Sequence, residues 1–191
     1  MVWGLWGGGS GVDSEGGVKI ALAAAYLGSI VAAAYAITHV GTQHDPHGPH
    51  VLPVWPGIEA PSGVYVVGVT LVLRDLLQHR VSKGAMFALI VVGTTLAAFV
   101  SPAVAVASGL AFAASESVDY AVFSALQKHG TYRAIAASNA VSLVVDSVLF
   151  LAIAFGSLAF VEGQVIGKAL STVAAIGVLF LIGRARKVVA R

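Results

Sequence analysis

Cysteine is absent from the 191-residue sequence, and charged residues make up only 10% of it. Without cysteine, the chain can form neither disulfide bonds nor metal sites built on thiolates. Soluble domains carry about 25% charged residues. The low charge, together with 58% hydrophobic residues and a mean hydropathy of +0.89, predicts a membrane protein.

Two motifs of nucleotide and ester chemistry are also missing. No G-x-x-x-x-G-K-[ST] occurs, so we do not expect the chain to hydrolyse nucleotides itself. No G-x-S-x-G occurs either, and all six histidines lie in loops or at span ends, which disfavours an intramembrane serine protease. We therefore expect a protein that is not an enzyme and that carries no cofactor.

Histidines gather in the segment 39–61, which is rich in proline and glycine and has no Lys or Arg. His44, His47 and His50 are spaced by three residues, with Asp45 nearby. This spacing leaves a zinc site open, but a solvated loop is the favoured interpretation in such a sequence. We predict no metal site here.

Six apolar segments are long enough to be considered as membrane-spanning helices. They cover residues 17–38, 62–77, 84–100, 103–126, 132–160 and 164–182. Residues 1–16 are glycine-rich and lack the features of a secretory signal peptide, so they are expected to form a flexible tail. The sequence thus predicts a six-helix transmembrane domain over 17–183 and a basic cytoplasmic tail over 184–191.

The distribution of Lys and Arg predicts the orientation of these spans. With six spans, nine of the eleven cations fall on the side of the two termini, whereas the loops 39–61, 101–102 and 161–163 have none. The positive-inside rule therefore places both termini in the cytoplasm. The net charge of +2 is explained by these loop cations, so we expect no nucleic-acid partner.

Small residues recur in the spans, as in ALAAAY, GTTLAAF and ASGLAFAAS. Small side chains let helices approach closely in lipid, where no hydrophobic force drives helices together. We therefore predict an all-α fold, a compact bundle of six transmembrane helices in the cytoplasmic membrane. Association into homo-oligomers is left open.

The fourth and fifth segments carry polar groups inside otherwise apolar sequence. Ser115, Glu116 and Asp119 share one helix face, and Asn139, Ser142 and Asp146 share another. The two segments are joined by a short turn, so we expect an antiparallel hairpin in which these faces meet. Arg74 and Lys168 are the cations at membrane depth that could neutralise the acids.

These polar groups have a structural interpretation as well as a functional one. Ser and Asn can join helices by hydrogen bonds, and we weigh this equally with a site for Ser115, Ser142 and Asn139. Arg74 and Asp75 could extend to the interface, and Asp119 could pair with Lys128. Glu116 and Asp146 lie deepest, where an ionisable residue indicates function.

A carboxylate in such a bundle could bind a proton, a cation or a planar heterocycle. Two parallel hydrogen bonds suit the N–H and amine edge of a guanine-like base, and Asn and Ser can meet its other edges. Phe112, Tyr120, Phe123 and Phe150 could stack on the ring, although aromatic side chains in spans usually serve packing.

Three stretches together resemble the queuosine precursor transporter family, also called vitamin-uptake-transporter-like. They are APSGVYVVGVTLVLRD (60–75), ASESVDYAVF (114–123) and SNAVSLVVDSVLFLAIAFGS (138–157), within a similarity over about 60–183. Many relatives have an Arg at the start of the fourth helix, where this chain has Pro102-Ala103-Val104.

The resemblance implies a six-helix inner-membrane transporter of 7-deazaguanine bases, such as 7-cyano-7-deazaguanine. By position, it implies a polar site of Arg74, Asp75, Glu116, Asp119, Asn139, Asp146 and Lys168. Transport could be facilitated, coupled to an ion, or powered by a partner. The alternative is a substrate-binding membrane subunit for another vitamin or nucleobase that works with a separate energising complex.

Overall fold

The computed structural model describes residues 13–189, which form six α-helices and a small sheet. The helices are α1 (Asp13–His39), α2 (Val64–Gln78), α3 (Lys83–Ala98), α4 (Pro102–Leu126), α5 (Thr131–Phe155) and α6 (Val161–Val189). α1 begins within the expected tail, of which residues 1–12 lie outside the described part. α6 continues through most of the basic segment that was expected to be a separate tail.

Among the residues that the structure describes, three helices are long and apolar enough to cross a membrane. These candidate spans are Glu15–His39, Ala136–Phe155 and Val161–Leu181, and α3 is a shorter apolar helix. α2 has 15 residues, about 22 Å at 1.5 Å per residue, which is less than the ~30 Å hydrocarbon core. The fold is that of a helical membrane protein, and the crossing of all six helices stays a prediction.

Local sequence explains where several helices begin and end. Ser82 and Ser101 cap α3 and α4, accepting hydrogen bonds from the backbone N–H groups of Ala85 and Val104. α5 was predicted to reach residue 160 but ends at Phe155, because Gly156 takes a left-handed conformation with φ 63°. Glycine reaches this conformation without steric cost, and it commonly terminates helices.

The segment 39–61 was predicted to be a loop, but it contains a small three-stranded antiparallel sheet, while the rest of the fold is helical as predicted. The strands are β1 (Thr42–Gln43), β2 (His50–Trp55) and β3 (Ile58–Pro61), in the order β1-β2-β3. The sheet was not predicted because the proline and glycine residues of this segment are also typical of loops. Pro56 and Gly57 form the turn between β2 and β3, with Gly57 at φ 78°.

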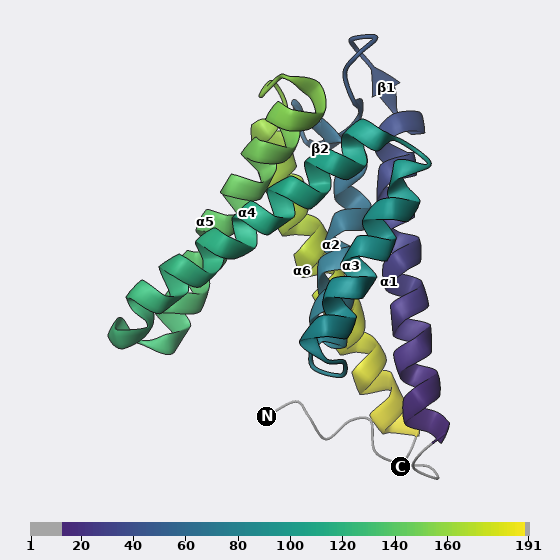
Figure 1. Cartoon of the computed structure of the whole chain (residues 1–191), viewed down its shortest axis with the longest axis vertical. Coiled ribbons are helices and arrows are strands. Elements are labelled where there is room, and N and C mark those ends of the chain that lie inside the picture. The colour runs from purple at the N-terminus through teal and green to yellow at the C-terminus, as the bar shows by residue number, and fades with distance from the viewer. Residues whose placement is uncertain (1–12, 190–191) are drawn as a thin grey trace.

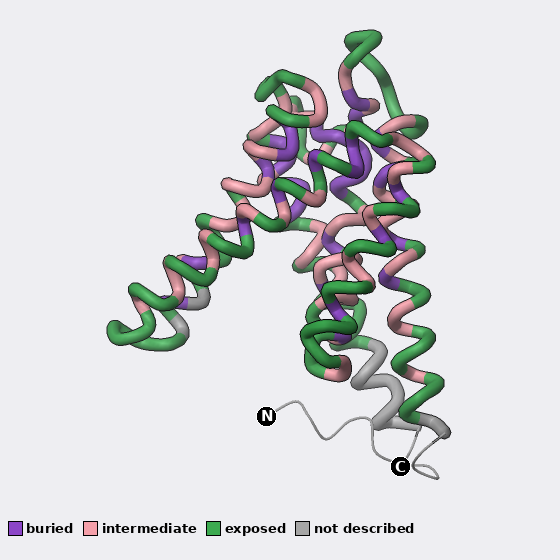
Figure 2. The backbone as a smooth tube through the Cα atoms, in the orientation of Figure 1, coloured by how far each residue is buried: buried purple, intermediate pink, exposed green. Residues whose placement is uncertain are grey.

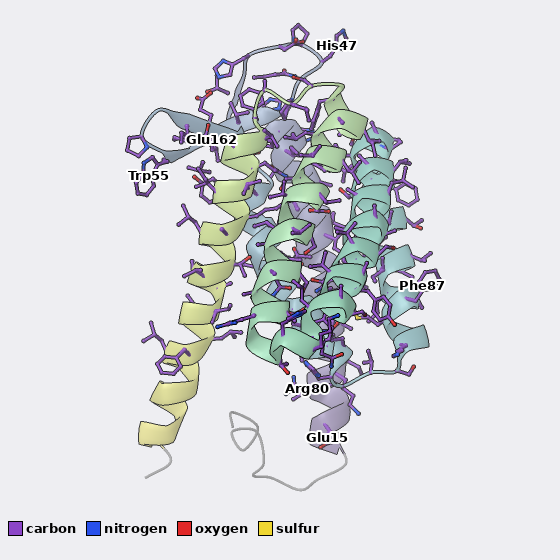
Figure 3. The ribbon with its side chains drawn as sticks, turned by 90° about the vertical axis from the view of Figure 1, so that its left-hand side faces the viewer. Glu15, His47, Trp55, Arg80, Phe87 and Glu162 are labelled. Atoms are coloured by element: carbon purple, nitrogen blue, oxygen red, sulfur yellow. The ribbon has the colours of Figure 1, made fainter. Side chains whose placement is uncertain are left out.

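The sheet lies at the end of the molecule opposite the start of α1 (Figure 1). Figure 3 shows Glu15 and Arg80 at one end, and His47, Trp55 and Glu162 at the other. The turn between α4 and α5 also lies at the end away from the sheet. The loops rich in cations are therefore on one side, and the side of the membrane that they face stays a prediction.

α4 and α5 form the expected antiparallel hairpin and pack mainly against each other. Ala107, Ala111 and Ser115 recur every fourth residue of α4 and are buried, as are Ala134 and Ser138 of α5. Away from the sheet, this hairpin diverges from α1, α2, α3 and α6 (Figure 1). Buried residues are concentrated near the sheet, where all the helices converge (Figure 2).

Large apolar side chains cover much of the outside of the helices. Phe87 is 68% exposed, Phe99 85% and Phe180 63%. Exposed apolar patches of this extent mark surfaces that contact lipid or another protein. Since these side chains lie on apolar helices of span length or nearly so, we assign them to the lipid.

Candidate functional site

A cavity of about 160 Å³ lies between the helices in the half of the molecule nearer the sheet. All six helices contribute to its wall, which is largely apolar and includes Ile30, Ile37, Val67 and Val104. An engineered protein cavity of about 150 Å³ is large enough to hold a benzene ring. Arg74, Asp146, Gln164 and Lys168 bring polar chemistry to the cavity.

The pair Lys168 and Asp146 joins α6 to α5 on the cavity wall. Lys168 Nζ donates a hydrogen bond to Asp146 Oδ2, and the lysine side chain is only 3% exposed. Lys168 Nζ also lies 5.9 Å from the centre of the Phe150 ring. A buried charge without a partner is strongly unfavourable. The ion pair therefore lowers the free-energy cost of placing each of these two charges here.

Close packing of α6 determines which of its side chains face the cavity. Gly163 and Gly167 are four residues apart, and a Cβ on Gly163 would overlap the Glu59 carbonyl oxygen of β3. A Cβ on Gly167 would lie 2.8 Å from Val64 Cγ1 of α2. Since the glycine face must meet β3 and α2, the next residues round the helix, Gln164 and Lys168, reach the cavity.

A second charged cluster joins α2 to α4. Arg74 Nη1 donates to Glu116 Oε1 at 2.6 Å, and its Nε and Nη2 donate to Asp75 Oδ1 at 3.2 and 3.1 Å. Arg74 Cζ also lies 5.3 Å from the centre of the Phe112 ring. Arg74 and Phe112 line the cavity. Asp75 and Glu116 do not line it, and their side chains are more exposed than that of Arg74.

The two acids judged deepest in the sequence therefore belong to different clusters. Glu116 was expected to face Asp146 and its neighbours across the hairpin, but it bonds to α2, and Asp146 bonds to α6. The prediction had assumed that the polar faces of α4 and α5, which follow each other in the sequence, contact one another. The observed partners are the cations that the sequence had singled out, Arg74 and Lys168.

The remaining predicted residues do not line the cavity. Ser115 Oγ donates to the Phe112 carbonyl oxygen at 2.9 Å, and Ser142 Oγ to that of Asn139 at 3.2 Å. The Asn139 side chain is exposed. In the described part of the chain, Asp119 forms no ion pair, and its buried Oδ1 has no hydrogen-bond partner.

Of the aromatic candidates, Phe112 and Phe150 line the cavity. Phe123 does not, and Tyr120 is 75% exposed. Phe112 and Phe150 approach Arg74 and Lys168, so each offers an aromatic face beside a cation. Tyr26 of α1, which was not among the predicted residues, also lines the cavity.

Sequence reasoning missed Gln164, which is 3% exposed and lines the cavity. It was treated as the boundary of the last span. Its position four residues before Lys168 was the available signal, because such residues share a helix face.

The histidine-rich segment offers no metal cage among the residues described. His44 Nε2 instead lies 2.7 Å from Glu59 Oε2, and its ring stacks on Phe160 at 6.5 Å. These contacts connect the β1–β2 loop to β3 and to the turn before α6. His44 therefore has a structural role, which accounts for one of the histidines in this segment.

Apolar helices around a cavity that holds paired charges define a helical membrane protein with an internal polar site. Residues 94–185, from the end of α3 into α6, match the model of a family described as "putative vitamin uptake transporter". The match covers just under half of the chain and supports a similarity to this family, whose description is that of a transporter. No curated protein and no solved structure matches the chain.

Proposed function

We propose that this protein imports a 7-deazaguanine base, such as 7-cyano-7-deazaguanine, across the cytoplasmic membrane as a precursor of queuosine. The observation that carries the proposal is the cavity with the Asp146 carboxylate on its wall. A carboxylate can accept two hydrogen bonds from the N–H and amine edge of such a base. Phe112 and Phe150 supply faces against which the ring can stack.

The charged residues have separate roles in this proposal. Asp146 contacts the substrate, and Lys168 holds the carboxylate in place. Arg74 contacts the substrate at the other end of the cavity. Hydrogen bonds to Asp75 and Glu116 hold its guanidinium group in place. Ser115, Asp119, Asn139 and Ser142 lie outside the cavity wall and are proposed to act only when the hairpin moves.

A second candidate follows from the family description, which speaks of vitamins. In it, the chain is the substrate-binding membrane subunit for another vitamin or nucleobase and works with a separate energising complex. Purified protein in proteoliposomes distinguishes the two, because a stand-alone carrier accumulates or equilibrates labelled base without any partner, whereas a subunit only binds it.

Complementation tests the proposed substrate. In a bacterial strain that can neither make nor import the precursor, expression of this chain should restore queuosine in tRNA when 7-cyano-7-deazaguanine is supplied. The empty vector and Asp146→Asn are the controls, and both should leave tRNA unmodified. Binding of an unrelated vitamin, with no binding of any deazapurine, would instead support the second candidate.

A further inference from the structure

We infer that Gln164 recognises the transported base by accepting one of its N–H groups, and so determines which bases enter the cavity. The inference rests on the proposed function, because it takes the cavity as the substrate site. It adds Gln164 of α6 as a recognition residue, and it requires a substrate with N–H donors along one edge.

The first observation is an unpartnered buried oxygen. Gln164 is 3% exposed, and its Oε1 has no hydrogen-bond partner. In the described part of the chain, the other such side-chain atom is Asp119 Oδ1, which is not on the cavity wall. Buried polar atoms are nearly always hydrogen-bonded, so an unpartnered acceptor on a residue that lines a cavity indicates a ligand donor.

The second observation is that the backbone of Gln164 is held in place. It lies in the first turn of α6, where its backbone N–H donates to the Phe160 carbonyl oxygen at 2.8 Å. Its neighbour Gly163 contacts the backbone of β3 so closely that any side chain would clash. The backbone at Gln164 therefore cannot rotate away from the cavity without separating α6 from the sheet.

The third observation is the chemistry of its neighbours. Gln164 Oε1 and the Asp146 carboxylate both accept hydrogen bonds, the Gln164 amide NH2 can donate one, and Lys168 already bonds to Asp146. The surroundings are mostly apolar, so water is a poor substitute for a ligand donor. This part of the cavity fits a neutral, flat heterocycle whose edge presents at least two N–H groups, as a 2-amino lactam does.

Gln164→Met tests this inference, because it keeps the length of the side chain and removes the acceptor. Binding of 7-deazaguanine to purified protein should weaken about tenfold to a hundredfold, as expected when a buried hydrogen bond is lost. Gln78→Met is the matched control, since Gln78 is exposed at the end of α2. Gln164→Leu repeats the test if the methionine variant does not fold.

Three analogues locate the donor: 7-deazahypoxanthine, which lacks the exocyclic amine, and the N1-methyl and N9-methyl derivatives of 7-deazaguanine. For one of them, the wild type and Gln164→Met should bind equally well.

The failures are distinguishable. If the wild type binds 7-deazaguanine and Gln164→Met binds it equally, the role of Gln164 is overturned and the proposed function stands. A loss of equal size in Gln164→Met with every analogue would also overturn it. If the wild type binds none of the four bases, the proposed substrate is wrong, and this inference falls with it.

Discussion

At the scale of single residues, the cavity depends on charges that are neutralised in pairs. Lys168 is almost fully buried, and its ammonium group has Asp146 as its ionic partner. Arg74 divides its donors between Glu116 and Asp75. Since removing one member of a buried pair leaves an uncompensated charge, substitutions at these positions affect stability as well as binding.

The Lys168–Asp146 pair predicts strong coupling between two substitutions. Asp146→Asn and Lys168→Met should each destabilise the protein, by about 3–5 kcal/mol, whereas the double variant should recover most of that loss. Unfolding of the purified protein in detergent measures all three. Uptake should remain absent in the double variant, because Asp146→Asn replaces one of the two acceptor oxygens by an NH2 donor and the base can no longer donate two hydrogen bonds to it.

Asp75→Asn is the control, because its side chain is 56% exposed and Arg74 keeps Glu116 as a partner. It should change stability by less than about 1 kcal/mol. Additive losses in the double variant would show that Lys168 and Asp146 do not interact.

At the scale of elements, glycines set the distance between α2, α6 and β3. A Cβ on Gly68 of α2 would overlap the backbone of Ser171, and Ser171 Oγ donates to the Val64 carbonyl oxygen at 2.9 Å. Gly163 gives α6 the same close approach to β3. The orientation of α6, and so of its cavity residues, follows from these contacts.

Gly68→Ala should therefore lower stability, by about 1–3 kcal/mol, because the backbones must separate. Gly177→Ala on α6 is the matched control, since nothing lies within 4 Å of its added Cβ. It should be neutral or stabilising, by up to about 1 kcal/mol, because alanine favours the helix. The midpoint of thermal unfolding in detergent compares the two, and equal midpoints would contradict the tight contact.

For the whole molecule, the helices converge at the sheet and the α4–α5 hairpin diverges at the other end (Figure 1). The cavity lies in the convergent half. The hydrogen bond from Arg74 to Glu116 connects α2 to the hairpin. The loops with Lys and Arg lie at the divergent end. Under the predicted orientation, this end faces the cytoplasm.

The absence of native cysteine makes the topology directly testable. Single cysteines at His47, in the β1–β2 loop, and at Lys128, beyond α4, should react with an impermeant maleimide from opposite sides of the membrane. In intact cells, His47→Cys should be labelled and Lys128→Cys should not, until the membrane is opened. Labelling of both in intact cells would exclude the predicted arrangement of spans.

Much of the helical framework could be predicted from the sequence. The six helices follow from long apolar runs and from breaks such as Ser101-Pro102, because hydrophobicity and capping act over short stretches of chain. The three-stranded sheet was missed because proline and glycine are typical of loops as well as of hairpin turns. The end of α5 was missed because Gly156 follows an apolar run without another break.

The sequence by itself determined the membrane character, the positions of the helices and the acids and cations that they carry. Only the tertiary structure decided which of these groups meet: Arg74 bonds to Glu116, 42 residues away, and Lys168 to Asp146, 22 residues away. It also brought Gln164 to the cavity. Such partners depend on how helices rotate and approach one another, and here close contacts at Gly68, Gly163 and Gly167 set that geometry.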